Sequence, residues 1–76
     1  MEAEKLKQEV ERVHGKAMMV GFGTNGVSGG CFYAVRIEFE VLADVPFLRV
    51  YVGKRKPMVA YVRAELVNYV RGHKEA

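Results

Sequence analysis

An alternation of apolar and charged positions marks residues 31–42, CFYAVRIEFEVL, as a β-strand. Every odd-numbered position in this stretch is apolar or amphipathic, whereas Arg36, Glu38 and Glu40 occupy even-numbered positions. A period of two turns one face of a strand toward the core and the other face away from it. We therefore expect residues 31–42 to form the central strand of a small sheet.

Apolar residues at three- and four-residue spacing predict two amphipathic helices, over residues 2–14 and 57–71. Gly15 and Gly72 follow these stretches and suit helix ends, while Pro57 suits a first helical position. The chain is therefore expected to begin and end with a helix.

Two shorter apolar stretches, near residues 17–22 and 48–52, predict the neighbouring strands. A turn over residues 42–47 is expected to hold Pro46 away from the hydrogen-bond ladder. The expected cross-strand pairs are Val41–Leu48, Phe39–Val50 and Ile37–Val52 on the buried face, and Glu40–Arg49 and Glu38–Tyr51 on the other. The fold expected for the single domain 1–76 is α+β, a three-stranded antiparallel meander with two helices packed on one face, in the order αβββα.

The length and composition favour a small binding module over an enzyme. A chain of 76 residues forms one domain and is too short for a cleft between two lobes. Its start is charged from the second residue, and no apolar run is long enough to span a membrane. Cys31 is the only cysteine, which excludes an intrachain disulfide and predicts a cytoplasmic protein. His14 and His73 lack partners at ligand spacing, so no metal or other cofactor is expected.

A glycine-rich stretch, residues 21–30, admits two interpretations. Gly21, Gly23 and Gly26 have the G-x-G-x-x-G spacing of a dinucleotide-binding loop. That mechanism needs a helix directly after the glycines, and a β-patterned stretch stands there instead. A flexible hairpin connection with positive φ at Asn25-Gly26 is the interpretation that we favour.

Two carboxylates, Glu38 and Glu40, lie on one face of the central strand at a separation from which acid and base catalysis could be imagined. Arg36 and Arg49 are expected beside them, which favours a surface ion-pair ladder. No catalytic residue is therefore expected.

Basic side chains gather in the second half of the chain. Residues 1–44 carry five basic and seven acidic side chains, whereas residues 45–76 carry seven basic and two acidic ones. Lys54, Arg55 and Lys56 precede the second expected helix, where the helix dipole disfavours cations and no side chain caps the free amides. A phosphate would satisfy both defects, and a solvated turn that protects a sheet edge is the alternative.

Aromatic and basic side chains also share the sheet face that the two helices are expected to leave open. Such a face could be covered by a second copy of the chain or by nucleic-acid bases that stack on its rings. The expected interface residues are Met19, Phe32, Phe47 and Tyr51, and the expected nucleic-acid contacts are Lys54, Arg55, Lys56, Arg63, Arg71, Arg36 and Arg49.

The order helix, strand, strand, strand, helix resembles two RNA-associated folds, the double-stranded RNA-binding domain and the small proteins of the Alu part of the signal recognition particle. In the former family a basic cluster opens the last helix, and Lys54, Arg55 and Lys56 stand near that place. The resemblance lies in element order rather than in motif, so it bears on the fold.

These observations predict a small non-enzymatic nucleic-acid-binding module, with RNA favoured over DNA, that uses the basic cluster before the second helix. The alternative is a structural or adaptor protein that forms a homodimer or binds a protein partner through the open aromatic face. The high valine content and the absence of tryptophan are typical of a thermophilic source.

Overall fold

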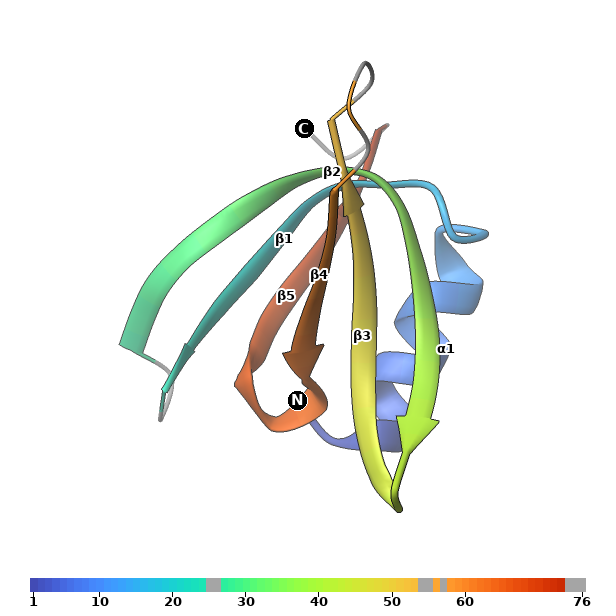
Figure 1. Cartoon of the computed structure of the whole chain (residues 1–76), viewed down its shortest axis with the longest axis vertical. Coiled ribbons are helices and arrows are strands. Elements are labelled where there is room, and N and C mark those ends of the chain that lie inside the picture. The colour runs from blue at the N-terminus through green and yellow to red at the C-terminus, as the bar shows by residue number, and fades with distance from the viewer. Residues whose placement is uncertain (25–26, 54–55, 57, 74–76) are drawn as a thin grey trace.

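The computed structural model describes residues 1–24, 27–53, 56 and 58–73 (Figure 1). Its elements are α1 (Ala3–Arg12), β1 (Ala17–Thr24), β2 (Val27–Leu42), β3 (Val45–Val52), β4 (Met58–Arg63), the 3-10 helix η1 (Ala64–Leu66) and β5 (Val67–Gly72). The strands form one antiparallel sheet in the order β4-β3-β2-β1-β5. The α+β class and the antiparallel sheet are confirmed. The three-stranded meander with two helices is wrong, because the described chain has five strands and one α-helix.

The stretch expected to be the second helix forms β4, η1 and β5 instead. Its side chains include Val59, Tyr61 and Val62, and β-branched and aromatic residues fit a pleated sheet. A corner at η1 separates the two strands, and their apolar positions taken together imitate a helical spacing. Without that helix, the resemblance to the two RNA-associated folds loses its basis in element order.

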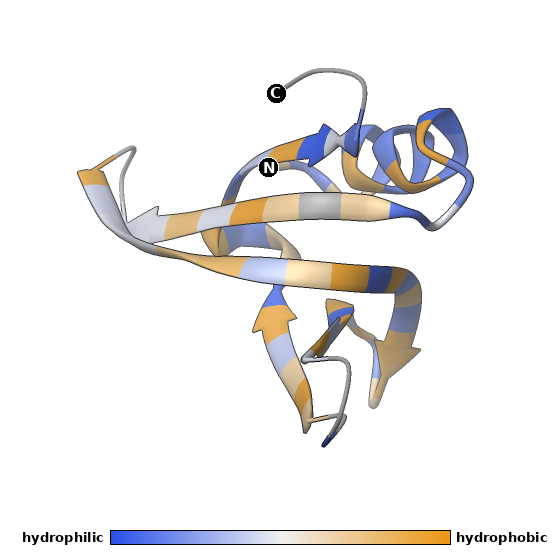
Figure 2. Cartoon of the chain, turned by 90° about the horizontal axis from the view of Figure 1, so that it is seen from above, coloured by the Kyte–Doolittle hydropathy of each residue, from blue (hydrophilic) through white to orange (hydrophobic). Residues whose placement is uncertain are grey.

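A β-bulge divides the long strand β2 into two halves with opposite phase. Ala34 pairs with Val52 and Arg36 pairs with Tyr51, so one extra residue, Val35, stands in β2. Figures 1 and 2 show β2 bending as it passes from β1 to β3, and bulges bend the strand that carries them. Odd-numbered side chains of β2 therefore face the core only after the bulge.

A two-residue turn between β2 and β3 sets the register. Ala43 and Asp44 have φ values of 49° and 64°, the positive φ at both positions that a type I′ hairpin requires. Pro46 consequently lies within β3, opposite Val41. Phe39 pairs with Leu48, so the expected register was wrong by two residues. Ile37, Leu48 and Val50 are buried as expected, whereas Val41 is 55% exposed.

The glycine-rich stretch is strand rather than loop over its described residues. Gly21 pairs with Cys31, Phe22 with Gly30, and a bulge follows before the strand ends. Asn25 and Gly26, to which a positive φ was assigned, lie outside the described residues. The expected hairpin is present, but its paired part is longer than the pattern indicated.

The helix α1 packs against β2, β5 and η1, with Leu6 fully buried. Arg12 Nη2 donates a hydrogen bond to the Val70 carbonyl oxygen at 2.9 Å, and the Met1 amino group donates to the Val67 carbonyl oxygen at 2.9 Å. The buried core consists of Leu6, Ala17, Val20, Ala34, Ile37, Leu48, Val50, Val62, Ala64, Val67 and Val70. Within the described residues, no helix has the length and apolar character that a membrane crossing requires.

Candidate nucleic-acid interface

The face of β2, β3 and β4 that points away from the core carries a dense set of aromatic and charged side chains. Inward residues of these strands, such as Ile37, Leu48 and Val50, are buried, so their sequence neighbours point outward. Cross-strand pairing arranges the outward residues in three rows. We call this surface the outer aromatic face, and its residues are Arg36, Tyr51 and Val59 in the first row, Glu38, Arg49 and Tyr61 in the second, and Glu40, Phe47 and Arg63 in the third.

Three rings on this face are held by edge and cation–π contacts. The rings of Phe47 and Tyr61 meet edge to face, with centroids 6.3 Å apart. The guanidinium of Arg49 lies 5.5 Å from the Tyr61 centroid, and that of Arg36 lies 5.4 Å from the Tyr51 centroid. Tyr61 remains 50% exposed, so one ring is both fixed and open to a ligand.

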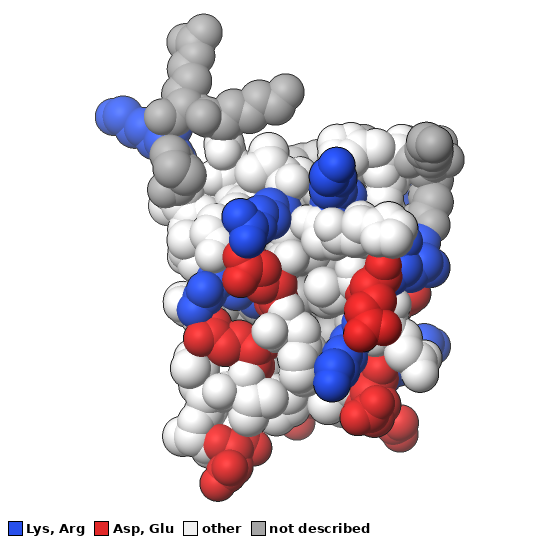
Figure 3. Space-filling model, turned by 90° about the vertical axis from the view of Figure 1, so that its right-hand side faces the viewer, with Lys and Arg blue, Asp and Glu red and all other residues white. Residues whose placement is uncertain are grey.

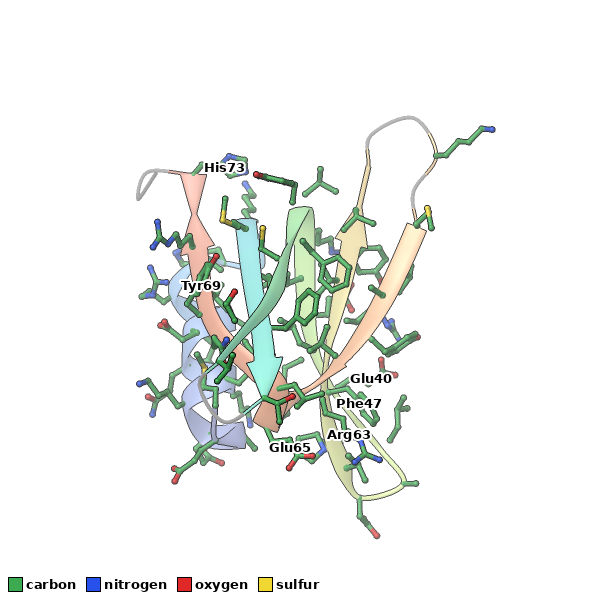
Figure 4. The ribbon with its side chains drawn as sticks, turned by 90° about the vertical axis from the view of Figure 1, so that its left-hand side faces the viewer. Glu40, Phe47, Arg63, Glu65, Tyr69 and His73 are labelled. Carbon is green, nitrogen blue, oxygen red and sulfur yellow. The ribbon has the colours of Figure 1, made fainter. Side chains whose placement is uncertain are left out.

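Carboxylates occupy the spaces between the arginines. Arg36 Nη2 lies 2.6 Å from Glu38 Oε1, and Arg49 forms ion pairs with both Glu38 and Glu40. The ion-pair interpretation of the two glutamates is therefore confirmed, with Glu40 diagonal to Arg49 rather than directly opposite. Figure 4 shows Glu40, Phe47 and Arg63 side by side on neighbouring strands.

Arg49 is the most constrained cation of the face. A hydrogen bond from its Nη1 to the Tyr51 hydroxyl, at 3.4 Å, raises the pKa of Arg49 above its usual value, and Tyr61 and the charge of Glu40 act in the same direction against burial. The side chain therefore stays cationic at every pH at which the protein is folded. It also contacts both tyrosine rings. By contrast, Arg36 and Arg63 are 65% and 58% exposed.

Only Lys56 of the basic triplet lies within the described residues. Lys54 and Arg55 lie outside the described residues, and Lys56 is exposed in the connection between β3 and β4. Because β4 is a strand, no helix N-terminus follows the triplet, and the expected use of helix amides for phosphate binding was wrong. Arg63 ends β4 on the outer aromatic face instead of lying on a helix flank.

Three other expected residues lie away from this face. Arg71 is exposed on β5, with its guanidinium 4.9 Å from the Tyr69 ring centroid. Met19 lies on β1 beside Arg71 and accepts a hydrogen bond from the Tyr69 hydroxyl. Phe32 points to the core and stacks on Phe22, so its assignment to an open face was wrong. The cause is the bulge in β2, which reverses the phase before it.

Sequence reasoning missed Tyr61, the most exposed ring of the outer aromatic face. The apolar spacing over residues 57–71 predicts a helix at this position, and a helical Tyr61 could not belong to a sheet face. The alternation of Val59, Tyr61 and Arg63 with the inward Ala60 and Val62 is the signal that indicates a strand.

The rest of the described surface has a cleft but no cluster of metal-ligating side chains. The described residues contain no group of three or more His, Cys, Asp or Glu side chains that could hold a metal ion. An open cleft of about 720 Å³ lies beside the start of α1, lined by Lys5, Thr24 and Asn68 among others. Comparisons with protein-family models, curated proteins and solved structures found no match to this chain.

Proposed function

We propose that the protein is a small non-enzymatic nucleic-acid-binding module that holds single-stranded RNA on the outer aromatic face. The observation that carries the proposal is the arrangement of three aromatic rings and three arginines on one face of β2–β4. No described strand or helix covers that face.

Base stacking would supply most of the binding free energy. Stacking of one base on one aromatic side chain contributes about 1–3 kcal/mol, whatever the base. Tyr61 is the exposed platform, and Tyr51 and Phe47 are half-buried beside it. Because Arg49 already fixes Tyr61 and Tyr51, little side-chain freedom would be lost when a base stacks.

Phosphate groups would compete with the glutamates for the more exposed arginines. Arg63 is 3.5 Å from Glu65 across an exposed pair, and Arg36 is paired with Glu38. Exposed ion pairs of this kind contribute only about 0–1 kcal/mol, so a phosphate can displace them. Lys56, in the connection just beyond the Arg36 row, would extend the contact along the backbone of the ligand.

Single-stranded RNA is preferred to duplex because unpaired bases can leave their stack and lie on the rings. We also infer a cytoplasmic location, since the one cysteine, Cys31, is a free exposed thiol.

A protein partner is the second candidate ligand for the same face. Glu38 and Glu40 balance the charges of Arg36 and Arg49, which makes this surface less cationic than most nucleic-acid interfaces. The two ligands respond differently to salt: phosphate contacts weaken steeply as salt rises, whereas an apolar interface holds or strengthens.

The proposal is tested by fluorescence anisotropy with labelled single-stranded RNA, single-stranded DNA and RNA duplex at two salt concentrations. Three matched tyrosine-to-leucine variants separate the face from the rest of the surface. We expect Tyr61→Leu and Tyr51→Leu to weaken binding of single-stranded RNA by about 1–3 kcal/mol each. Tyr33→Leu, at an exposed tyrosine of β2 before the bulge, should leave affinity unchanged.

Arginine variants test the phosphate contacts separately. Arg36→Ala or Arg63→Ala should each reduce the slope of log affinity against log salt by about one. Equal losses in Tyr33→Leu and Tyr61→Leu, or no binding at low salt, would refute the proposal.

A further inference from the structure

The two edges of the sheet are protected to different extents. Strand β5 is covered by α1, because Arg12 donates to the Val70 carbonyl oxygen and the Met1 amino group donates to the Val67 carbonyl oxygen. Strand β4, at the opposite edge, has β3 on one side and no described strand on the other (Figure 4). An uncovered edge presents unpaired N–H and C=O groups to any strand that approaches.

The turn between β2 and β3 determines which residues of β4 carry those groups. Leu42 and Val45 flank a two-residue turn and form a hydrogen-bonded pair, after which bonded and non-bonded pairs alternate. Pro46, which has no N–H, falls on a non-bonded pair, as this alternation requires.

Continued across β3, the same alternation assigns the backbone groups of β4. The backbone N–H and C=O groups of Leu48 and Val50 point toward β4. There Leu48 pairs with Val62, and Val50 pairs with Ala60. The backbone groups at the free edge are therefore those of the remaining residues, Val59, Tyr61 and Arg63.

Strand β4 also has few of the features that prevent edge pairing, since its one charged residue, Arg63, stands at its last position. It contains no proline, glycine, lysine or bulge, and Met58, Val59 and Tyr61 are 68%, 46% and 50% exposed. Natural sheets use such features to keep edges apart. Their absence leaves an apolar strand suited to pairing.

We propose that β4 pairs antiparallel with β4 of a second copy, about a two-fold axis at Tyr61. This register aligns Tyr61 with its symmetry mate and Val59 with Arg63 of the other copy, so all three residues with free edge groups face one another. A register centred on Ala60 would bring together the free backbone groups of Val59 and Tyr61 but not those of Arg63. The two-fold therefore lies at Tyr61, and no arginine opposes an arginine.

The charge distribution favours a second copy as the occupant and an antiparallel direction. Lys56 stands before β4 and Glu65 follows it. Both are exposed, and Glu65 also lies 3.5 Å from Arg63 at the end of β4. Figure 3 shows basic and acidic side chains interspersed over one side of the molecule. An antiparallel pair places the Lys56 end of each β4 alongside the Glu65 end of the other, whereas a parallel pair would bring like charges together.

The dimer joins the two sheets, and the outer aromatic faces of both copies then form one surface on the same side. This inference does not depend on nucleic-acid binding, since it concerns the protein alone. It is measured in the absence of any ligand.

Sedimentation equilibrium of the full chain tests the interface. We expect a dimer whose dissociation constant rises by about tenfold or more in Tyr61→Lys, because two ammonium groups then oppose each other at the two-fold axis. Tyr33→Lys is the matched control and should leave the dimer dissociation constant unchanged. Circular dichroism confirms that both variants fold. A wild-type monomer at about 1 mM, or a dimer insensitive to Tyr61→Lys, would overturn the proposal.

A charge exchange at the two ends of β4 tests the direction of pairing. Glu65→Lys and Lys56→Glu should each weaken the dimer, and the double variant should restore it, because both end contacts are then re-formed with reversed sign. Single variants that weaken the dimer without recovery in the double variant would contradict the antiparallel register.

Discussion

At the scale of single residues, Gly21 shows how closely this sheet is packed. A Cβ atom added there would overlap the ring of Tyr69 on β5. That ring cannot easily move aside, because its hydroxyl bonds Met19 at 3.4 Å and the Arg71 guanidinium lies 4.9 Å from its centroid. The aromatic ring covers the glycine and compensates for its missing side chain.

We predict that Gly21→Ala lowers the free energy of unfolding by about 1–3 kcal/mol, the usual cost of overpacking. Chemical denaturation measures the change. Gly29→Ala is the control, since the nearest atom to its added Cβ is 3.4 Å away, and it should be neutral or stabilising. If Tyr69→Ala in the Gly21→Ala background recovers none of the loss, the ring is not the cause.

Among the elements, the turn between β2 and β3 sets the register of the two strands, although its residues are poorly suited to its backbone conformation. Ala43 and Asp44 both have positive φ, a conformation that costs a residue other than glycine about 1–2 kcal/mol. Asn-Gly is the pair that a type I′ turn favours. The present turn therefore holds the register at some expense of stability.

Replacing the turn by Asn-Gly, with Ala43→Asn and Asp44→Gly, should stabilise the protein by about 1 kcal/mol and raise Tm by about 4–8 °C. Thermal unfolding followed by circular dichroism measures this shift. Ala43→Val should lower Tm, because a β-branched residue fits positive φ poorly. A lower Tm for the Asn-Gly variant would contradict the type I′ assignment.

The sequence predicted secondary structure correctly where a run of apolar spacing belongs to a single helix or strand. Residues 2–14 bury a single side, and the structure confirms a helix there, with Leu6 in the core. Over 57–71 the same spacing arises from two strands at a corner. Apolar spacing cannot distinguish these cases, because it records burial without recording which partner provides it.

Only part of the candidate site could be predicted from the sequence. Arg36, Arg49, Phe47 and Tyr51 were expected on one face, and the structure places them there. The bulge at Val35 could not be found from the sequence, because the alternation runs through it without interruption.

At the scale of the whole molecule, the dimer proposed above has a thermodynamic consequence. Association stabilises only the folded state, so the unfolding temperature depends on protein concentration. Wild-type Tm should rise as the protein concentration is increased, whereas in Tyr61→Lys the same rise should need about tenfold more protein. Differential scanning calorimetry over a wide concentration range measures both, and a constant wild-type Tm would contradict the dimer.

Alternation along the sequence was enough to place the core side chains of β3 and of β2 after its bulge, but it misplaced Phe32, Val35 and Val41. Ile37, Phe39, Leu48 and Val50 share one face, as their alternation predicts, because hydrophobic burial acts on each side chain whatever its partner. The sequence by itself also determined the first helix and the antiparallel sheet. These features follow from local periodicity.

Only the tertiary structure decided the number of strands, their register and the composition of the outer aromatic face. Tyr61 joins that face because β4 pairs with β3, and Phe32 leaves it because one extra residue reverses the phase of β2. Hydrogen bonds between distant strands select among patterns that bury the same residues, and that selection depends on which backbone groups find partners.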